Sequence, residues 1–140
     1  MDKEKFKEGF FHIFKAAGYS LAGLATGLRL SLAFRQEAAI LALLIVLLGV
    51  YGKPASTWLI GIGAWLLVMM AELLNTAIEE ALNLITTDYN IHVKHAKDMA
   101  SAAVFLMLAL NAALWFCMFV LCLFEDDWMS VYGEGKETFW

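Results

Sequence analysis

The segment AELLNTAIEE, residues 71–80, decides how this chain is interpreted, because it follows a fourteen-residue apolar run, WLIGIGAWLLVMMA, residues 58–71. Successive residues of an α-helix advance by about 100°, so Glu72, Asn75 and Glu79 fall on one face within about 60° of arc. Asn83 continues this polar stripe, whereas Glu80 points elsewhere.

A carboxylate in a membrane helix is costly and is expected to face protein or water and to serve a function. For Asn75 alone, a structural hydrogen bond between helices would be the simpler interpretation. Three polar residues in register favour a functional site instead.

The composition places the surrounding chain in a membrane. Of its 140 residues 61% are hydrophobic, and the mean hydropathy is +0.68, whereas soluble domains are about 45–50% apolar. Three apolar segments, residues 28–52, 58–85 and 99–124, are each long enough to cross a hydrocarbon core about 30 Å thick. The first segment carries Arg29, Arg35, Gln36 and Glu37 at its wet end. We therefore predict an all-α integral membrane protein that forms one domain, residues 1–140.

The two ends of the chain differ in character. Residues 1–27 place Phe6, Phe10 and Phe14 on one face of a helix and lysines elsewhere, which predicts an amphipathic helix on the membrane surface. A soluble helix that packs on protein is the alternative. We expect Gly18, Gly23 and Gly27 to let the chain turn into the first span. Residues 125–140 form an acidic tail.

Basic residues predict the orientation of the spans, because lysine and arginine are retained on the cytoplasmic side. Eight of the ten basic residues precede the first span, lie at its wet end, or lie between the second and third spans. We therefore expect a multi-pass protein of the cell inner membrane, with the N-terminus and the loop 86–98 cytoplasmic and the C-terminus external. The net charge is −4, but its acidic and basic residues are expected on different sides of the membrane. The net charge therefore indicates little about partners, and no nucleic-acid partner is expected.

The cytoplasmic loop supplies further polar residues near the stripe. Lys97 and Asp98 open the third span, and the loop is short enough to return Lys97 to the cytoplasmic half of the second span. An interfacial anchor and a helix N-terminal charge are the simpler interpretations of this pair. Together with the stripe, however, they suit phosphoryl transfer to a lipid: one carboxylate deep in the membrane removes a hydroxyl proton, a shallower one holds Mg²⁺, and the lysine steadies nucleotide phosphates. The chain has neither a P-loop nor the glycine-loop and HRD motifs of protein kinases.

Four motifs carry a resemblance to a known family: KAAGYS (15–20), AFRQE (33–37), AELLNTAIE (71–79), and AKDM followed by SAAV (96–104). Across residues 9–124 the chain resembles the small prokaryotic membrane diacylglycerol kinases, which include undecaprenol kinases. The resemblance implies a homotrimer whose active sites are shared between neighbouring subunits. It also implies ATP as co-substrate, Mg²⁺ as cofactor, and conversion of diacylglycerol to phosphatidic acid.

The resemblance implies a role for each residue at a matching motif position. Glu72 would be the general base on the lipid hydroxyl, Asn75 would support it, and Glu79 would bind the metal, with Ser31 at a second metal position. The residues implied in nucleotide binding are Lys97, Asp98, Tyr19, Lys15 and His12. The residues implied in lipid binding are Glu72, Ala33, Gln36 and Glu37.

The chain departs from the family pattern at several of these positions. Ser31 and Asn83 stand where the family carries acids, His12 stands at a usually basic position, and Asn90 replaces a loop histidine. We therefore expect that the protein needs a higher Mg²⁺ concentration, or that Glu37 or Glu80 contributes to metal binding. An undecaprenol kinase and an inactive or regulatory homologue are therefore alternatives. A transporter has less support, because no inverted repeat or proline-broken helix is present.

Overall fold

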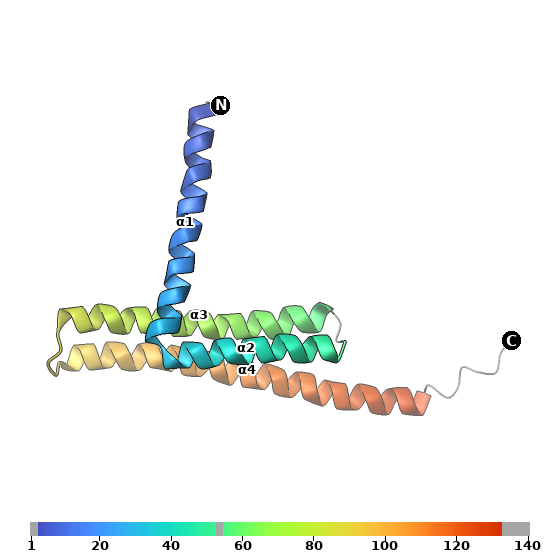
Figure 1. Cartoon of the computed structure of the whole chain (residues 1–140). Helices are drawn as coiled ribbons and strands as arrows, with labels where there is room; N and C mark the ends of the chain where they lie inside the picture. The colour runs from blue at the N-terminus through green and yellow to red at the C-terminus, as the bar shows by residue number, and fades with distance from the viewer. Residues whose placement is uncertain (1–2, 53–54, 133–140) are drawn as a thin grey trace.

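The computed structural model describes residues 3–52 and 55–132, and these form helices joined by short turns (Figure 1). Helix α1 spans Lys3–Leu30, α2 spans Leu32–Val50, α3 spans Ala55–Ile85 and α4 spans Ile91–Tyr132. Three of them contain segments long and apolar enough to cross a membrane: Leu32–Val50, Ala55–Ile85 and Ile91–Val120. The prediction of an all-helical chain with three helices that could span a membrane is confirmed.

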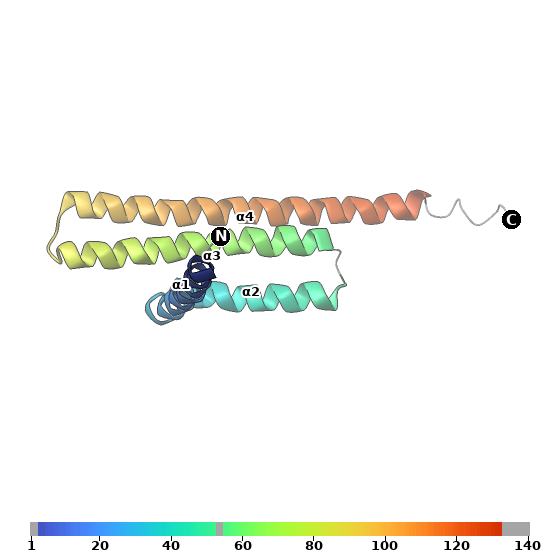
Figure 2. The ribbon, with the colours of Figure 1, turned by 90° about the horizontal axis from the view of Figure 1, so that it is seen from above.

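Helix α3 is the centre of the arrangement. Helices α2, α3 and α4 run alongside one another, whereas α1 projects away from them (Figure 1). Seen from above, α3 lies between α2 and α4 (Figure 2), and it contacts all three other helices. The helix that carries the polar stripe therefore packs against each of the other described helices.

The corner between α1 and α2 is made by Ser31. Its backbone is extended (φ −96°, ψ 124°), and its side-chain oxygen accepts a hydrogen bond of 3.0 Å from the Phe34 amide, so that it caps α2. The expectation that glycines make this turn is wrong, because α1 continues as a helix through all three of them. Gly27 has another role: a Cβ there would collide with Leu73 and press on Phe34. The missing side chain lets α1 approach α3 closely.

The helices differ in length, which decides what lies at the membrane edge. Helix α2 has 19 residues and is about 28 Å long, just enough to cross the hydrocarbon core. Helix α3 has 31 residues and is about 46 Å long. The end of α3 and the beginning of α4 therefore form a hairpin that extends beyond the level of α1 (Figure 1).

Helix α4 begins earlier in the chain than the predicted third span, directly after the hairpin turn. Asn90 caps the helix, because its Oδ1 accepts from the His92 amide at 2.8 Å. Helix α4 consequently begins at Ile91, eight residues before the predicted third span, and its backbone stays helical to Tyr132, past the predicted end at residue 124.

The protein interior is small, and much apolar surface faces outward. Phe34 and Val68 are the largest fully buried side chains among the described residues. Gly61 of α3 packs against the Trp115 ring of α4. Large apolar side chains line the outside of the bundle, as a lipid environment requires. The apolar residues of α1 are also exposed, among them Phe11, Ile13 and Phe14; a membrane-surface position for this helix stays a prediction.

Candidate functional site

Buried polar residues gather where α2 begins and meets α3. Ser31, Glu37, Glu72 and Asn75 are each at most 9% exposed, although burial of a polar or charged group is unfavourable unless it is hydrogen-bonded. Two of them belong to the predicted stripe of α3, and the other two come from the start of α2. The fold thus joins AFRQE and AELLNTAIE, two of the motifs singled out in the sequence.

Glu72 is held at this junction by two hydroxyl groups. Ser31 Oγ donates to Glu72 Oε1 at 2.7 Å, and Thr76 Oγ1 donates to the same oxygen at 3.4 Å. Ser31 is the N-cap of α2, so this contact places Glu72 at the level where α2 begins. The depth of Glu72 in a membrane stays a prediction.

The rest of the stripe continues towards the hairpin. Asn75 Nδ2 donates to Glu79 Oε1 at 3.3 Å, so these two residues share a face as predicted. Asn75 Oδ1 is buried without a hydrogen-bond partner in the described part of the chain, and so is Glu37 Oε2. Buried oxygens without a donor are uncommon and call for an explanation such as an absent ligand. The main-chain oxygen of Glu37 accepts from Trp65 Nε1 at 2.9 Å, which ties α2 to α3.

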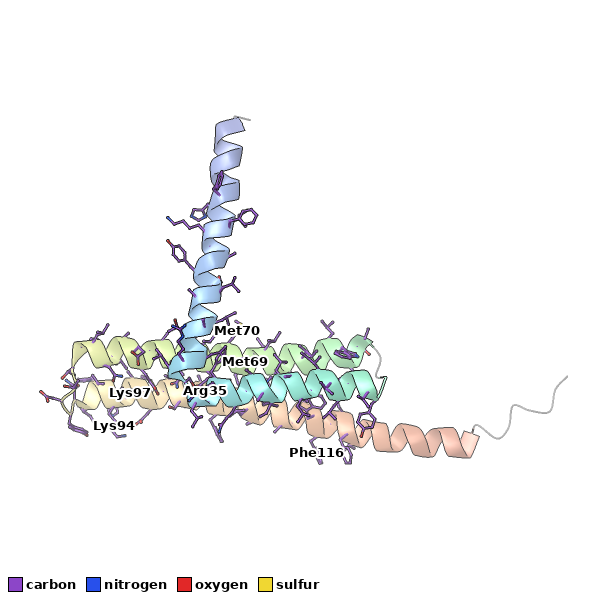
Figure 3. All side chains as sticks on the ribbon, in the orientation of Figure 1. Arg35, Met69, Met70, Lys94, Lys97 and Phe116 are labelled. Atoms are coloured by element: carbon purple, nitrogen blue, oxygen red, sulfur yellow. The ribbon has the colours of Figure 1, made fainter. Side chains whose placement is uncertain are left out.

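The hairpin brings Lys97 back to α3, as the loop length predicted. Lys97 Nζ donates to Asn83 Oδ1 at 2.8 Å; Asn83 is exposed and Lys97 is half-buried. Asp98 forms an exposed ion pair with Lys94 at 2.5 Å. Lys94 and Lys97 both lie near the α3–α4 turn (Figure 3). Sequence reasoning missed Lys94, although its position four residues before Asp98 on a helix is a signal for an ion pair.

The candidate nucleotide residues of α1 lie apart from this hairpin. His12, Lys15 and Tyr19 are exposed on α1, which points away from the bundle (Figure 1). Of the candidate lipid residues on α2, Ala33 and Gln36 are exposed whereas Glu37 is buried. One chain therefore brings together Ser31, Glu37, Glu72, Asn75 and Glu79, and separately Lys97 and Asn83, but it does not bring the α1 residues to either group.

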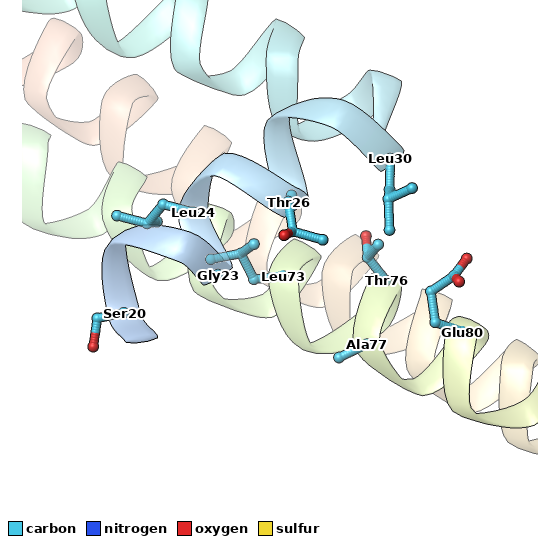
Figure 4. Close-up of a pocket in the computed structure, with 10 residues that line it drawn as sticks. Ser20, Gly23, Leu24, Thr26, Leu30, Leu73, Thr76, Ala77 and Glu80 are labelled. Carbon is cyan, nitrogen blue, oxygen red and sulfur yellow. The ribbon is translucent and has the colours of Figure 1, made fainter. Parts of the chain in front are cut away.

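An open groove lies between α1 and α3 (Figure 4). Its volume is about 710 Å³, and its wall is mostly apolar. Residues that line it include Leu24, Thr26 and Leu30 of α1 and Leu73, Thr76 and Glu80 of α3. Thr76 also bonds to Glu72, so a residue of the groove wall contacts the carboxylate. Sequence reasoning missed the groove, because it depends on the angle between two helices.

The donor set of the stripe suits a hard cation. No three histidine, cysteine, aspartate or glutamate side chains within residues 3–52 and 55–132 are placed to hold a metal ion. Mg²⁺, however, is usually bound through one or two carboxylates together with substrate phosphates. Glu79 offers a carboxylate, whereas Asn75 faces that carboxylate with its amide nitrogen, which cannot ligate a metal. Glu79 therefore fits a magnesium ion whose other ligands a nucleotide would supply.

Comparison with known proteins relates the whole arrangement to one family. Residues 18–119 match the family model described as prokaryotic diacylglycerol kinase. The chain is 38% identical over 107 residues to the diacylglycerol kinase of Escherichia coli (strain K12), covering 76% of this chain and 88% of the relative. It is 35% identical to that of Haemophilus influenzae, covering 76% and 91%, and 34% identical to that of Pseudomonas aeruginosa, covering 79% and 90%. The chain therefore belongs to the prokaryotic diacylglycerol kinase family.

Proposed function

We propose that this protein is an ATP-dependent lipid kinase that converts diacylglycerol and ATP to phosphatidate and ADP. Membership of the family supports the reaction class, and the names of the relatives support the acceptor. The observation that carries the proposal is the place of Glu72: a buried carboxylate, held by Ser31 and by Thr76, which also lines an apolar groove. A diacylglycerol whose free hydroxyl lies near the membrane surface would reach this carboxylate where α2 begins.

In the proposed reaction Glu72 is the general base. Its carboxylate accepts the proton of the lipid hydroxyl, the hydroxyl oxygen bonds to the γ-phosphorus, and the bond from that phosphorus to the bridging oxygen of ADP breaks. Positioned general bases contribute about 10²–10⁴-fold to rate. Asn75 supports the site from the next turn of α3, and Glu37 faces the lipid from α2.

The nucleotide would approach from the hairpin. Lys97 supplies a compact cation for its phosphates, and Asn83 holds that cation at the end of α3. Glu79 would hold Mg²⁺, which neutralises phosphate charge when bound. Asp98, paired with Lys94, belongs to the same polar end of the molecule. A role for Ser31 as a second metal ligand stays a prediction.

The separation of the α1 residues supports a shared site. His12, Lys15 and Tyr19 would reach a nucleotide held by another copy of the chain in a homotrimer, since they reach neither polar group of their own chain. The proposed location is the cell inner membrane, with α1 on the cytoplasmic surface, the hairpin in the cytoplasm and the C-terminus external.

Phosphate transfer from labelled ATP tests the proposal. Purified protein in detergent micelles is given diacylglycerol or undecaprenol, with and without Mg²⁺. Transfer to diacylglycerol that requires Mg²⁺ is the expected result. Faster transfer to undecaprenol would change the acceptor, and no transfer to either lipid from a folded trimer would identify an inactive homologue, in which the substitutions at Ser31 and Asn83 silence the site.

A further inference from the structure

The hydroxyl group of Ser31 has two hydrogen bonds that serve different elements. Its oxygen accepts from the Phe34 amide at 3.0 Å and caps α2, and its proton is donated to Glu72 Oε1 at 2.7 Å. Ser31 is 8% exposed and Glu72 is 6% exposed. Hydrogen bonds to a charged acceptor in a buried site are shorter and stronger than those between neutral groups.

We propose that Ser31 is a positioning residue for Glu72, an inference that rests on the proposed function of Glu72 as general base. The cap fixes the serine oxygen relative to the backbone of α2, and the donated proton fixes Glu72 Oε1 relative to that oxygen. With Oε1 occupied by Ser31 and Thr76, Glu72 Oε2 is the oxygen available to a lipid hydroxyl. The start of α2 thus determines which carboxylate oxygen takes the proton.

This assignment differs from the metal-ligand role that the family resemblance implies for the same position. The single proton of the hydroxyl and one of its lone pairs are already used by Glu72 and Phe34. A neutral hydroxyl is also a weaker ligand for Mg²⁺ than a carboxylate. The two roles predict opposite effects of a negative charge at residue 31, which makes them separable.

Three substitutions at residue 31 provide the test, with kcat, the KM for ATP and the Mg²⁺ dependence measured in micelles. Ser31→Thr keeps both hydrogen bonds and should stay within about two-fold of the original kcat. Ser31→Ala removes both and should lower kcat about ten-fold or more with the KM for ATP unchanged. Ser31→Asp can cap α2 but cannot donate a proton when ionised, so it should lower kcat at least as far at every Mg²⁺ concentration. Ser56→Ala removes an exposed hydroxyl at the far end of α3 and should change nothing.

Two results would overturn the proposal. If Ser31→Asp raised kcat or lowered the Mg²⁺ concentration for half-maximal rate, residue 31 would be a metal position. If Ser31→Ala matched Ser31→Thr in kcat, the hydrogen bond would not position the base.

A thermal-unfolding cycle tests the contact without any turnover. Ser31→Ala should lower the melting temperature by more in the original chain than in a Glu72→Ala background. Only in the original chain does the substitution take from a buried carboxylate the shorter of its two hydrogen bonds. Equal shifts would refute the contact. If the original chain transfers phosphate to neither lipid, the proposed function fails, while this cycle still decides whether Ser31 holds Glu72.

Discussion

The two polar regions of this molecule, the corner of Ser31 and Glu72 and the hairpin of Asn83 and Lys97, are built in opposite ways. The corner is buried, and its hydrogen bond joins residues 41 positions apart in the chain. The hairpin is exposed, and its hydrogen bond joins residues 14 positions apart across one turn. Electrostatic interactions are strong where water is excluded and weak where it is not. The corner therefore suits proton transfer at a fixed oxygen, and the hairpin suits the capture of a soluble anion.

The largest expected effect concerns the corner. Glu72→Gln removes the base with almost no change in volume, so phosphate transfer should fall by about 10²–10⁴-fold while the melting temperature and ATP binding change little. Asp88→Asn removes an exposed charge in the hairpin turn and is the matched control. A Glu72→Gln enzyme that retained the original rate would exclude this carboxylate as the base.

Glu79 lies between the two regions, and its substitution should alter the metal requirement. Glu79→Gln should raise the Mg²⁺ concentration for half-maximal rate on the order of ten-fold, as the loss of groups that support a metal does elsewhere. A Mg²⁺ titration at saturating ATP measures this. An unchanged titration would count against Glu79 as a metal ligand.

Gly27 tests the packing of the corner without altering a polar group. Gly27→Ala places a methyl group against Leu73 and Phe34 and should destabilise the fold by about 1–3 kcal/mol, as overpacking does. Gly23→Ala is the control, because no atom lies within 4 Å of the added carbon and alanine favours a helix. Thermal unfolding in micelles compares the two; equal melting temperatures would mean that α1 does not pack closely on α3.

Asn83 should affect nucleotide binding moderately. Asn83→Ala frees Lys97 from its acceptor and should raise the KM for ATP about three- to five-fold with a smaller change in kcat, because an exposed hydrogen bond to a charge contributes about 1 kcal/mol or less. Asn83→Gln, which keeps an acceptor on a longer side chain, should recover part of the loss. If the KM for ATP is the same in all three proteins, Asn83 does not position the lysine.

The smallest effect is expected at the ion pair of Lys94 and Asp98. Lys94→Ala should change the unfolding free energy by less than about 0.5 kcal/mol, because exposed pairs four residues apart on a helix are weak. Thermal unfolding at low and high salt measures it. A loss of unfolding free energy comparable to that of Gly27→Ala would show that this ion pair is shielded from water.

Much of this architecture follows from local patterns in the sequence. The lengths and hydropathy of the apolar segments predicted three membrane helices, and the angular spacing of Glu72, Asn75 and Glu79 predicted one polar face. Both depend on helix geometry, which is the same in every protein. The short loop 86–98 also predicted that Lys97 returns to α3, because a connection of that length leaves few alternatives.

Only the tertiary structure decided how the patterns meet. Nothing in the sequence indicated that Ser31 ends α1, caps α2 and donates to Glu72, or that Gly27 serves a close contact and not a turn. The groove likewise depends on the angle at which α1 leaves α2. Such features arise from packing between residues distant in the chain, whereas helix periodicity is set by neighbours three and four residues apart.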